Sequence, residues 1–451
     1  MGSPDIIAAI ATPPGKGGIG VIRISGKNLK PLAESILGKI PQARYAQFSK
    51  FSDVNGQIID QGIALYFSAP NSYTGEDVLE LQGHGGPVVL NLLLNRCLLA
   101  GARLAQPGEF TLRAYLNNKL DLLQAESVAD IIEASSNEAV RCAMRSLHGS
   151  FSETIQELVA LLTELRILIE ATLDFPEEEI DILQSLQVEN KLEVIRNKLD
   201  QVLTSSRQGN LLQEGIKIVL AGRPNVGKSS LLNRLAEEDV AIVTEIPGTT
   251  RDINQQIINL EGIPIHIIDT AGLRETNDIV EKKGIERTHA AIKKADMIIW
   301  LIDSSCPITE TNKEIFQDLA EKLPQITVYN KIDLLNESPR IEDDSKNTII
   351  YLSAKTGEGM SLFRQKLLEI VGWKFNNAGE GLFMARQRHL QALSHAKSHL
   401  EQAQVFSQNE FQLELLAEEL RLSQDALSSI TGQFTADDLL GKIFSHFCIG
   451  K

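Results

Sequence analysis

Cysteines are few in this sequence, and a long apolar run is lacking. The 451 residues include Cys97, Cys142, Cys306 and Cys448, and no two of them have the spacing of a metal-binding or redox pair. This argues against a disulfide framework or a zinc site and predicts buried or free thiols. No apolar run reaches the ~18 residues of a membrane span, and the first residues lack the pattern of a secretory signal. We therefore expect a cytoplasmic protein with no membrane contact.

An excess of positive charge is also lacking. The formal net charge is −15, which argues against loose binding to nucleic acid, because phosphate contacts need clustered Lys and Arg. Residues 1–119 depart from this balance, with eleven Lys/Arg against eight Asp/Glu. We therefore expect an anionic ligand to bind this first part of the chain better than the rest.

The pattern of apolar residues predicts a multidomain protein, since the chain exceeds one ordinary core. Short apolar runs, Gly/Pro turns and a helix at 88–100 indicate an α+β domain at the start. Between Gly215 and Gly372, strand-like runs alternate with helical stretches, which predicts an α/β domain with a doubly wound parallel sheet. Helical sequence flanks it on both sides, so we predict that it is inserted into an α-helical domain. The predicted domains are residues 1–119, 120–212, 213–375 and 376–451.

One buried helix face is predicted within the first helical part. Its apolar residues recur at steps of four and three. They are Leu147, Phe151, Ile155, Leu158, Leu162, Leu165 and Ile169. The acidic cluster of Asp174 and Glu177–Glu179 has the ligands for a metal ion, but a solvated helix start is favoured, because acids there complement the helix dipole.

The run GRPNVGKS, Gly222–Ser229, has the composition of a phosphate-binding loop. It follows the apolar strand IKIVLA and precedes the helical SSLLNRLAEE, which is the context such a loop requires. Glycines allow backbone N–H groups to surround phosphate oxygens, Lys228 adds a cation near the β- and γ-phosphates, and Ser229 offers a hydroxyl to magnesium. A Gly-rich turn without function is the alternative.

Three further motifs each end a predicted strand. Asp269–Gly272 (DTAG) suits magnesium and the γ-phosphate, and Ser353–Lys355 (SAK) offers a backbone N–H to the guanine carbonyl. In Asn330–Asp333 (NKID), the Asp333 carboxylate accepts two hydrogen bonds from guanine, which selects GTP over ATP. Because ligands bind at the carboxyl ends of such strands, four motifs in this order predict a Ras-like P-loop GTPase.

The residue after DTAG is Leu273, where Ras-like proteins use a Gln. An apolar side chain cannot orient the attacking water, so another polar group is required. The next residues offer Glu275, Asp278 and Glu281. From the residues alone, a solvated charge on a mobile switch helix is the favoured interpretation for each of these acids.

Four further segments carry a resemblance to a known family. They are ATPPGKGGIGVIRISG (11–26), SYTGEDVLELQGHGG (72–86), PGEFTLRAYLNNKLDLLQAE (107–126) and CIGK (448–451). With the nucleotide motifs, they make the chain resemble, over its whole length, the MnmE (TrmE) family of tRNA modification GTPases. That family belongs to the translation-factor-related GTPases that include Era and EngA.

The resemblance implies a potassium-activated GTPase whose catalytic residue is Glu281, the Glu of VEKKGIER. It assigns magnesium to Ser229 and Thr250. It also implies that Asn225 and the carbonyls of Thr244, Ile246 and Thr249 bind potassium. The bound ion would stabilise the negative charge of the transition state, as an arginine finger does in other GTPases. Alternatively, Thr244–Arg251 is an ordinary switch that closes on magnesium through Thr250 alone. The predicted GTP contacts are Asn225, Val226, Gly227, Lys228, Ser229, Ser230, Thr244, Glu245, Ile246, Pro247, Gly248, Thr249, Thr250, Asp269, Thr270, Ala271, Gly272, Asn330, Lys331, Asp333, Ser353, Ala354 and Lys355.

The resemblance also implies an N-terminal domain that forms a homodimer and binds a tetrahydrofolate derivative, either 5-formyl or 5,10-methylene. Folate contacts fall on Arg23, Glu80, Lys119 and Lys451. Arg23 and Lys119 suit anions and Glu80 suits a pterin amine, although each alone is an ordinary surface charge. Cys448 has either a chemical role or that of a small apolar anchor for the tail.

The implied partner is the flavoprotein MnmG (GidA), which brings FAD and forms a heterotetramer with the homodimer. The implied reaction modifies C5 of the wobble uridine of certain tRNAs with a one-carbon unit, while potassium-dependent dimerisation of the GTPase domains drives hydrolysis. A GTP-controlled ribosome-assembly or RNA-binding switch is the rival interpretation. A folate-binding regulatory protein is disfavoured, because it has no need of a complete set of nucleotide motifs.

Overall fold

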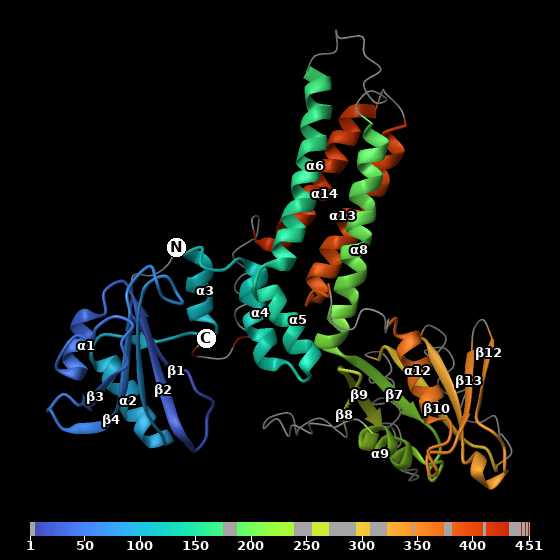
Figure 1. Cartoon of the computed structure of the whole chain (residues 1–451), viewed down its shortest axis with the longest axis horizontal. Coiled ribbons are helices and arrows are strands. Elements are labelled where there is room, and N and C mark those ends of the chain that lie inside the picture. Colours follow the sequence, from blue (N-terminus) through green and yellow to red (C-terminus); the bar gives the residue numbers. More distant parts are fainter. Residues whose placement is uncertain are drawn as a thin grey trace, which may run out of the picture. The chain divides into compact units, whose positions relative to one another are not determined.

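The computed structural model divides into two compact units, each of which is described by itself (Figure 1). The first comprises residues 1–129, 146–195 and 395–451, and the second comprises 130–145 and 196–394. The residues described are 5–174, 187–238, 255–269, 295–306, 323–344, 347–373, 381–408 and 412–432, with Ile443, Phe447 and Gly450.

The first unit begins with a mixed sheet whose described strands follow the order β3-β4-β5-β2-β1-β6. All neighbours pair antiparallel except β1 and β6. The elements are β1 (Ile7–Ile10), β2 (Gly17–Gly26), α1 (Lys30–Leu37), β3 (Gln47–Ser52), β4 (Ile58–Phe67), β5 (Asp77–Gly85), α2 (Pro87–Leu99), β6 (Arg103–Leu104) and α3 (Glu109–Leu116). The α+β prediction and the helix predicted at 88–100 are therefore confirmed.

Side-chain alternation decides which face of this sheet is buried. Ile22 and Ile24 of β2 and Leu79 and Leu81 of β5 are fully buried in one core with residues of α1 and α2. Successive side chains of a strand point to opposite faces. Arg23, between the two isoleucines, and Glu80, its partner in the register, therefore lie together on the other face.

Long helices continue this unit. They include α6 (Ser150–Asp174) and α14 (Leu413–Thr431), which pack against each other. The predicted stripe from Phe151 to Ile169 is buried on α6. Leu147 was wrongly placed on this helix, because it ends α5 (Asn137–Leu147) and Gly149, with a φ of +95°, separates the two helices.

The chain's last residues return to the first domain of this unit. Ile443 and Phe447 pack with Leu122 and Ala125 of α4 (Leu122–Glu133). Tyr115 of α3 donates its hydroxyl to the Gly432 carbonyl at 2.9 Å. The described residues near the C-terminus therefore contact α3 and α4.

The second unit contains a sheet with the order β12-β13-β11-β10-β7-β9-β8 among the described strands. The inner strands, from β13 to β9, are parallel, and β12 and β8 pair antiparallel at the edges. The elements are β7 (Ile216–Ala221), α9 (Lys228–Glu238), β8 (Gln255–Leu260), β9 (Ile263–Asp269), β10 (Met297–Asp303), β11 (Gln325–Asn330), the 3-10 turn η3 (Ile332–Leu334), β12 (Arg340–Asp344), β13 (Asn347–Leu352) and α12 (Met360–Ile370). The α/β prediction is confirmed.

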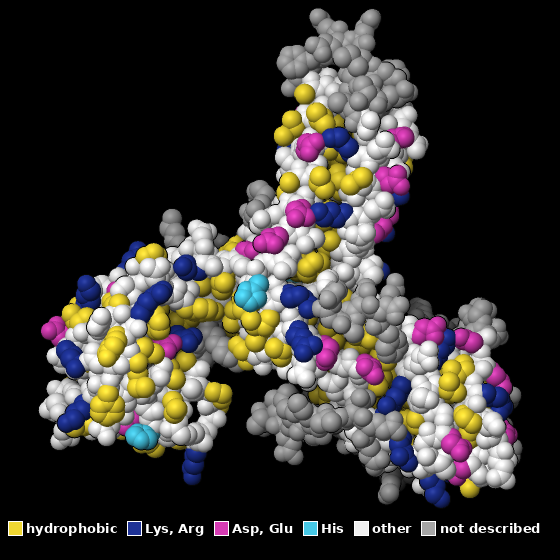
Figure 2. All heavy atoms as spheres, in the orientation of Figure 1, with side chains coloured by type: hydrophobic (Ala, Val, Ile, Leu, Met, Phe, Trp, Pro, Cys, Tyr) yellow, Lys and Arg dark blue, Asp and Glu magenta, His cyan; other side chains and the backbone are white. Residues whose placement is uncertain are grey.

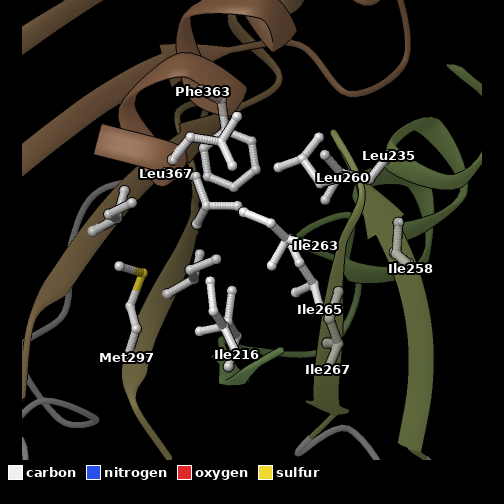
Figure 3. Close-up of a cluster of buried hydrophobic side chains, with 14 of the residues drawn as sticks. Ile216, Leu235, Ile258, Leu260, Ile263, Ile265, Ile267, Met297, Phe363 and Leu367 are labelled. Atoms are coloured by element: carbon white, nitrogen blue, oxygen red, sulfur yellow. The ribbon is translucent and has the colours of Figure 1, made fainter. Parts of the chain in front are cut away.

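Figure 3 shows the core that holds this sheet to its helices. Ile263, Ile265 and Ile267 alternate along β9 and all face the core, where Leu235 of α9 and Phe363 of α12 meet them. This packing fixes the strand ends relative to the start of α9, and the nucleotide motifs lie at those ends.

The entry and exit of the α/β domain are joined to each other. α8 (Val188–Glu214) leads into β7, and α13 (Gln387–Phe406) follows the domain. Asn210 of α8 donates to the Ala385 carbonyl at 3.0 Å. A Cβ on Gly209 would lie 1.7 Å from the Phe383 carbonyl oxygen, so only glycine permits this approach. The inserted domain is thus tied to helical sequence at both ends.

Candidate functional site

The phosphate-binding loop runs from the end of β7 to the start of α9. Gly227 has a φ of +101°, and a Cβ there would lie 2.2 Å from Nδ2 of Asn330. Both the backbone conformation and the close approach therefore require glycine. α9 begins directly after it, so unpaired N–H groups and the positive end of the helix dipole lie where phosphates bind in such loops.

Lys228 and Ser229 are the first residues of this helix. The Lys228 ammonium is buried and donates to the carbonyls of Gly222, at 2.5 Å, and Arg223, at 3.1 Å. Ser229 and Ser230 are exposed at the same helix start. The cation and the hydroxyls that a magnesium–phosphate group needs are thus placed together.

Asn330 joins the phosphate-binding loop to the last motif. Its Nδ2 donates to the Val226 carbonyl at 2.8 Å, and its Oδ1 accepts from the Ala354 N–H at 2.9 Å. The side chain is 2% exposed. Three of the four predicted motifs therefore converge on one buried amide.

Asp333 lies in η3, directly after this junction. Its Oδ1 is buried and has no hydrogen-bond partner among the described residues. An unpaired buried carboxylate oxygen is costly unless a ligand donates to it. Guanine has two adjacent N–H donors of the kind required, so the residues present fit this base.

The SAK motif is held from within its own loop. Ser353 accepts from the N–H of Thr356 through its hydroxyl, at 3.2 Å, and from that of Gly357 through its carbonyl, at 2.9 Å. Arg234 of α9 donates to the Lys355 carbonyl at 2.8 Å. The loop is thus fixed against the helix that follows the phosphate-binding loop.

Sequence reasoning missed an ion pair at this site. Lys331 Nζ lies 2.6 Å from Asp303 Oδ2 and donates to the Asn225 carbonyl at 2.8 Å. Asp303 ends β10, so its position at the carboxyl end of a parallel strand was a usable signal. Hydrogen bonds from Lys331 and Ser305 keep the pKa of Asp303 below its ordinary value, although burial by itself raises it.

Several predicted residues lie outside the described part of the chain. These are Thr244–Thr250, Thr270–Gly272, Leu273, Glu275, Asp278, Glu281, Cys448, Lys451 and the acidic cluster after Asp174. For Asp269, the backbone is described: it ends β9 and pairs with Leu220 of β7, next to the phosphate-binding loop.

Arg23 and Glu80 form a second polar site, on the face of the first sheet opposite to the core of α1 and α2. Arg23 Nε donates to Glu80 Oε1 at 2.9 Å, and Nη1 donates to the Gly450 carbonyl at 3.3 Å. The guanidinium also lies 5.8 Å from the centre of the Tyr73 ring. The Gly450 carbonyl, one residue before Lys451 in the sequence, therefore lies at Arg23.

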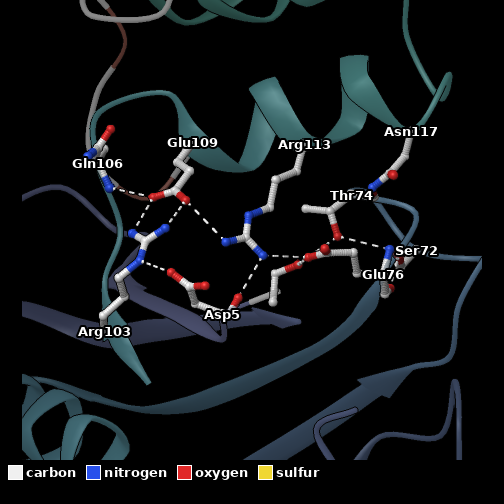
Figure 4. Close-up of polar contacts among 10 residues, drawn as sticks. Asp5, Ser72, Thr74, Glu76, Arg103, Gln106, Glu109, Arg113 and Asn117 are labelled. Carbon is white, nitrogen blue, oxygen red and sulfur yellow. Dashed lines mark hydrogen bonds and ion pairs between the residues drawn. The ribbon is translucent and has the colours of Figure 1, made fainter. Parts of the chain in front are cut away.

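A largely buried polar network joins three N-terminal segments (Figure 4). Ser25 bonds to Thr74 at 2.7 Å and to Glu76 at 2.9 Å, and Glu76 pairs with Arg113 at 2.8 Å. Arg113 also pairs with Glu109, whose pKa stays below its ordinary value because hydrogen bonds from Arg103, Gln106 and Arg113 outweigh the effect of burial. Residues from 11–26, 72–86 and 107–126 thus form one structure.

Lys119 lies beside the loop of residues 72–76, which contributes Thr74 and Glu76 to this network. A Cβ on Gly75 would lie 3.3 Å from Lys119 Cγ, and Gly75 has a φ of +78°. The aliphatic part of the Lys119 side chain therefore lies against the loop that carries Tyr73, and Lys119 is an exposed residue. Three of the four predicted folate residues are described, and each borders this loop or the strand pair beside it.

Other candidate chemistry finds little support. Cys97 and Cys142 are buried, and burial raises the pKa of their thiols to about 12 and about 11. No group of His, Cys, Asp and Glu among the described residues is arranged to hold a metal ion, and no described helix is apolar enough over sufficient length to cross a bilayer. On the face shown in Figure 2, Lys and Arg are interspersed with acidic and apolar side chains.

Comparison with known proteins gives full-length similarity. The family model described as GTP-binding protein TrmE N-terminus matches residues 6–119, and that of the MnmE helical domain matches 122–448. A protein of Nitrosomonas europaea named tRNA modification GTPase MnmE is 65% identical, with both chains fully covered. A protein of the same name from Thiobacillus denitrificans is 56% identical, covering 99% of this chain and 98% of that one.

A solved structure of Era from Aquifex aeolicus bound to GDP and AlF4⁻ was also matched. It is 24% identical over 41% of this chain and 66% of that one, with a TM-score of 0.27. So low a score adds nothing to the assignment, which rests on the family models and the full-length relatives. On these grounds, the chain belongs to the MnmE family.

Proposed function

We propose that this chain hydrolyses GTP and acts in the modification of tRNA. One observation carries the nucleotide part: Asn330 joins the phosphate-binding loop to the SAK loop and leaves Asp333 Oδ1 buried beside the junction without a partner among the described residues. The tRNA part rests on family membership and on the name that the relatives carry.

The site residues would divide the work of hydrolysis. Lys228 and the N–H groups at the start of α9 hold the phosphates, and Asp333 reads the base. Ser229 and Thr250 would hold magnesium, which when bound neutralises charge on the phosphates. The Lys228 ammonium is held inside the loop by the carbonyls of Gly222 and Arg223, which places its charge where the phosphates would bind.

A finer part of the proposal concerns potassium and Glu281. Asn225 is exposed and has a φ of +63°, and its side chain has no hydrogen bond among the residues described, which supports a role as a cation ligand. Thr244, Ile246 and Thr249 would complete that set. Glu281 would position the attacking water when the GTPase domains of a homodimer meet.

A second finer part assigns the N-terminal domain to a tetrahydrofolate derivative. Arg23, Glu80, Lys119 and Lys451 would contact it, and the 72–76 loop would form one wall. The domain limits 1–119, 120–212, 213–375 and 376–451 belong to this proposal. Together with the flavoprotein MnmG, the homodimer would modify C5 of wobble uridines in the cytoplasm.

The tRNA function predicts the effect of removing the protein. Deletion of the gene is expected to abolish a C5 modification of wobble uridines, and wild-type protein should restore it. Lys228→Ala should not restore it, because the phosphates lose their cation. Mass spectrometry of digested tRNA measures the nucleosides. Unchanged tRNA together with accumulated ribosomal precursors would instead support the ribosome-assembly switch.

The folate assignment predicts a loss of binding when the two cations are neutralised together. Arg23→Gln with Lys119→Gln should weaken binding of 5-formyltetrahydrofolate by about tenfold or more, because each charged hydrogen bond is worth about 1.5–3 kcal/mol. Isothermal calorimetry on the full chain measures this. The control is Lys30→Gln with Lys39→Gln, which neutralises two exposed lysines at α1. Equal affinity in both double variants would remove the assignment.

A further inference from the structure

Asp303, which the proposed function does not use, pairs at the nucleotide site with Lys331 of the NKID motif. Asp303 Oδ2 is 2.6 Å from Lys331 Nζ, and the same ammonium donates to the Asn225 carbonyl at 2.8 Å. Asp303 Oδ1 accepts from the N–H and hydroxyl of Ser305, at 3.0 and 2.6 Å. The carboxylate is therefore held by its own strand end while it holds the ammonium.

This ion pair is partly withdrawn from solvent. The side chains of Asp303 and Lys331 are 14% and 30% exposed. Hydrogen bonds between ionised groups are stronger than neutral ones, and partial burial reduces their screening by water and salt. The pair therefore differs from an exposed surface ion pair, which contributes little.

Lys331 and Asn225, whose carbonyl accepts from the Lys331 ammonium, are both in unusual backbone conformations. Lys331 has a φ of +70° and Asn225 a φ of +63°, and neither is glycine. Such conformations persist where the surrounding structure holds them. The contact of Lys331 Nζ with the Asn225 carbonyl connects the Asn330–Asp333 loop, which is proposed to bind guanine, directly to the phosphate-binding loop. Asp303 keeps the Lys331 ammonium in place.

We propose that Asp303 is a positioning residue for nucleotide binding, which acts through Lys331 and sets the spacing of the two loops. This inference rests on the proposed GTP function of the site. A guanine nucleotide spans both loops, so its affinity depends on their spacing. Without the carboxylate, the ammonium loses its counter-charge and is less firmly held at the Asn225 carbonyl.

The test is Asp303→Asn in the full chain, with a fluorescent GDP analogue as the probe. We expect binding to weaken about tenfold, from the loss of a charge-assisted hydrogen bond. The matched control is Asp343→Asn, on β12 of the same sheet. Asp343 likewise pairs with a lysine, Lys366, and accepts from a hydroxyl, that of Thr348, but is not among the residues of the nucleotide motifs. Unchanged GDP affinity in Asp303→Asn would overturn the proposal.

A second background separates positioning from general destabilisation. In Lys331→Ala, the further change Asp303→Asn should have no additional effect on GDP affinity, because its route of action is gone. The same tenfold loss in both backgrounds would also overturn the proposal. If wild-type protein does not bind GDP, the proposed function fails, and this inference fails with it. If wild-type protein binds GDP and Asp303→Asn binds it equally well, only this inference fails.

Discussion

Asp333→Asn is expected to weaken GTP binding by about 100-fold or more, from the loss of hydrogen bonds to a charged group, and to admit xanthosine nucleotides. A carboxylate accepts from both N–H donors of guanine, whereas an amide presents one donor and one acceptor. Xanthine carries a carbonyl where guanine carries its amine, so the amide matches it. The buried Oδ1 makes the mismatch with guanine costly, because burying a polar atom without a hydrogen-bond partner carries a desolvation cost.

The measurement is competition of GTP and XTP against a fluorescent GDP or XDP analogue. Gain of xanthosine binding by the variant is its own control for folding, since a misfolded site would lose both nucleotides. Lys228→Ala should weaken both nucleotides in either background, because it acts on the phosphates. Equal GTP affinity in Asp333→Asn and wild type would show that this residue does not read the base.

The sequence was sufficient for the inner strands of the sheet and for the nucleotide motifs at their ends. The buried strands β7 and β10 are nearly continuous apolar runs, and such runs are typical of parallel strands covered on both faces. The motif spacing also located Asn330, although its two hydrogen bonds become visible only when the strands are side by side.

The edge strands were not predicted, for a physical reason. β8 reads QQIINL and β12 reads RIEDD, so polar or charged residues make up half of the first strand and most of the second, and one side of each strand is unpaired. Edge strands are commonly protected from further pairing in this way. Local apolar pattern therefore identifies the centre of a sheet better than its borders.

Long-range polar contacts were also beyond sequence reasoning. The Asp303–Lys331 pair and the Glu76–Arg113 pair join residues 28 and 37 positions apart, and nothing in the local pattern of either partner identifies the other. The charge excess of residues 1–119 predicts that an anionic ligand binds better there than elsewhere, and two of its cations, Arg23 and Arg113, each pair with a glutamate.

Glu281→Ala is expected to retain GTP but to lose turnover by about 100- to 10,000-fold, the range for a positioned acid–base group. The reason is Leu273, which stands where Ras-like proteins carry the Gln that orients water. Glu275→Ala and Asp278→Ala are matched controls, because both remove an acid from the same segment. Phosphate release and nucleotide affinity are measured for all three. A loss shared equally by the three variants would indicate that the segment matters only for its total charge.

Exchange of potassium for sodium at constant ionic strength tests the second half of this mechanism. Sodium is smaller and should coordinate poorly in a loop shaped for potassium, so turnover should fall while nucleotide affinity changes little. Asn225→Ala should lower the rate in potassium to the rate in sodium, because it removes a proposed side-chain cation ligand and keeps the backbone carbonyl that Lys331 contacts. The combined effect of Glu281→Ala and sodium should then be smaller than the product of the single effects, since both act on the same transition state. Equal rates in the two salts, or a wild-type rate in Glu281→Ala, would leave a conventional switch with another catalytic group.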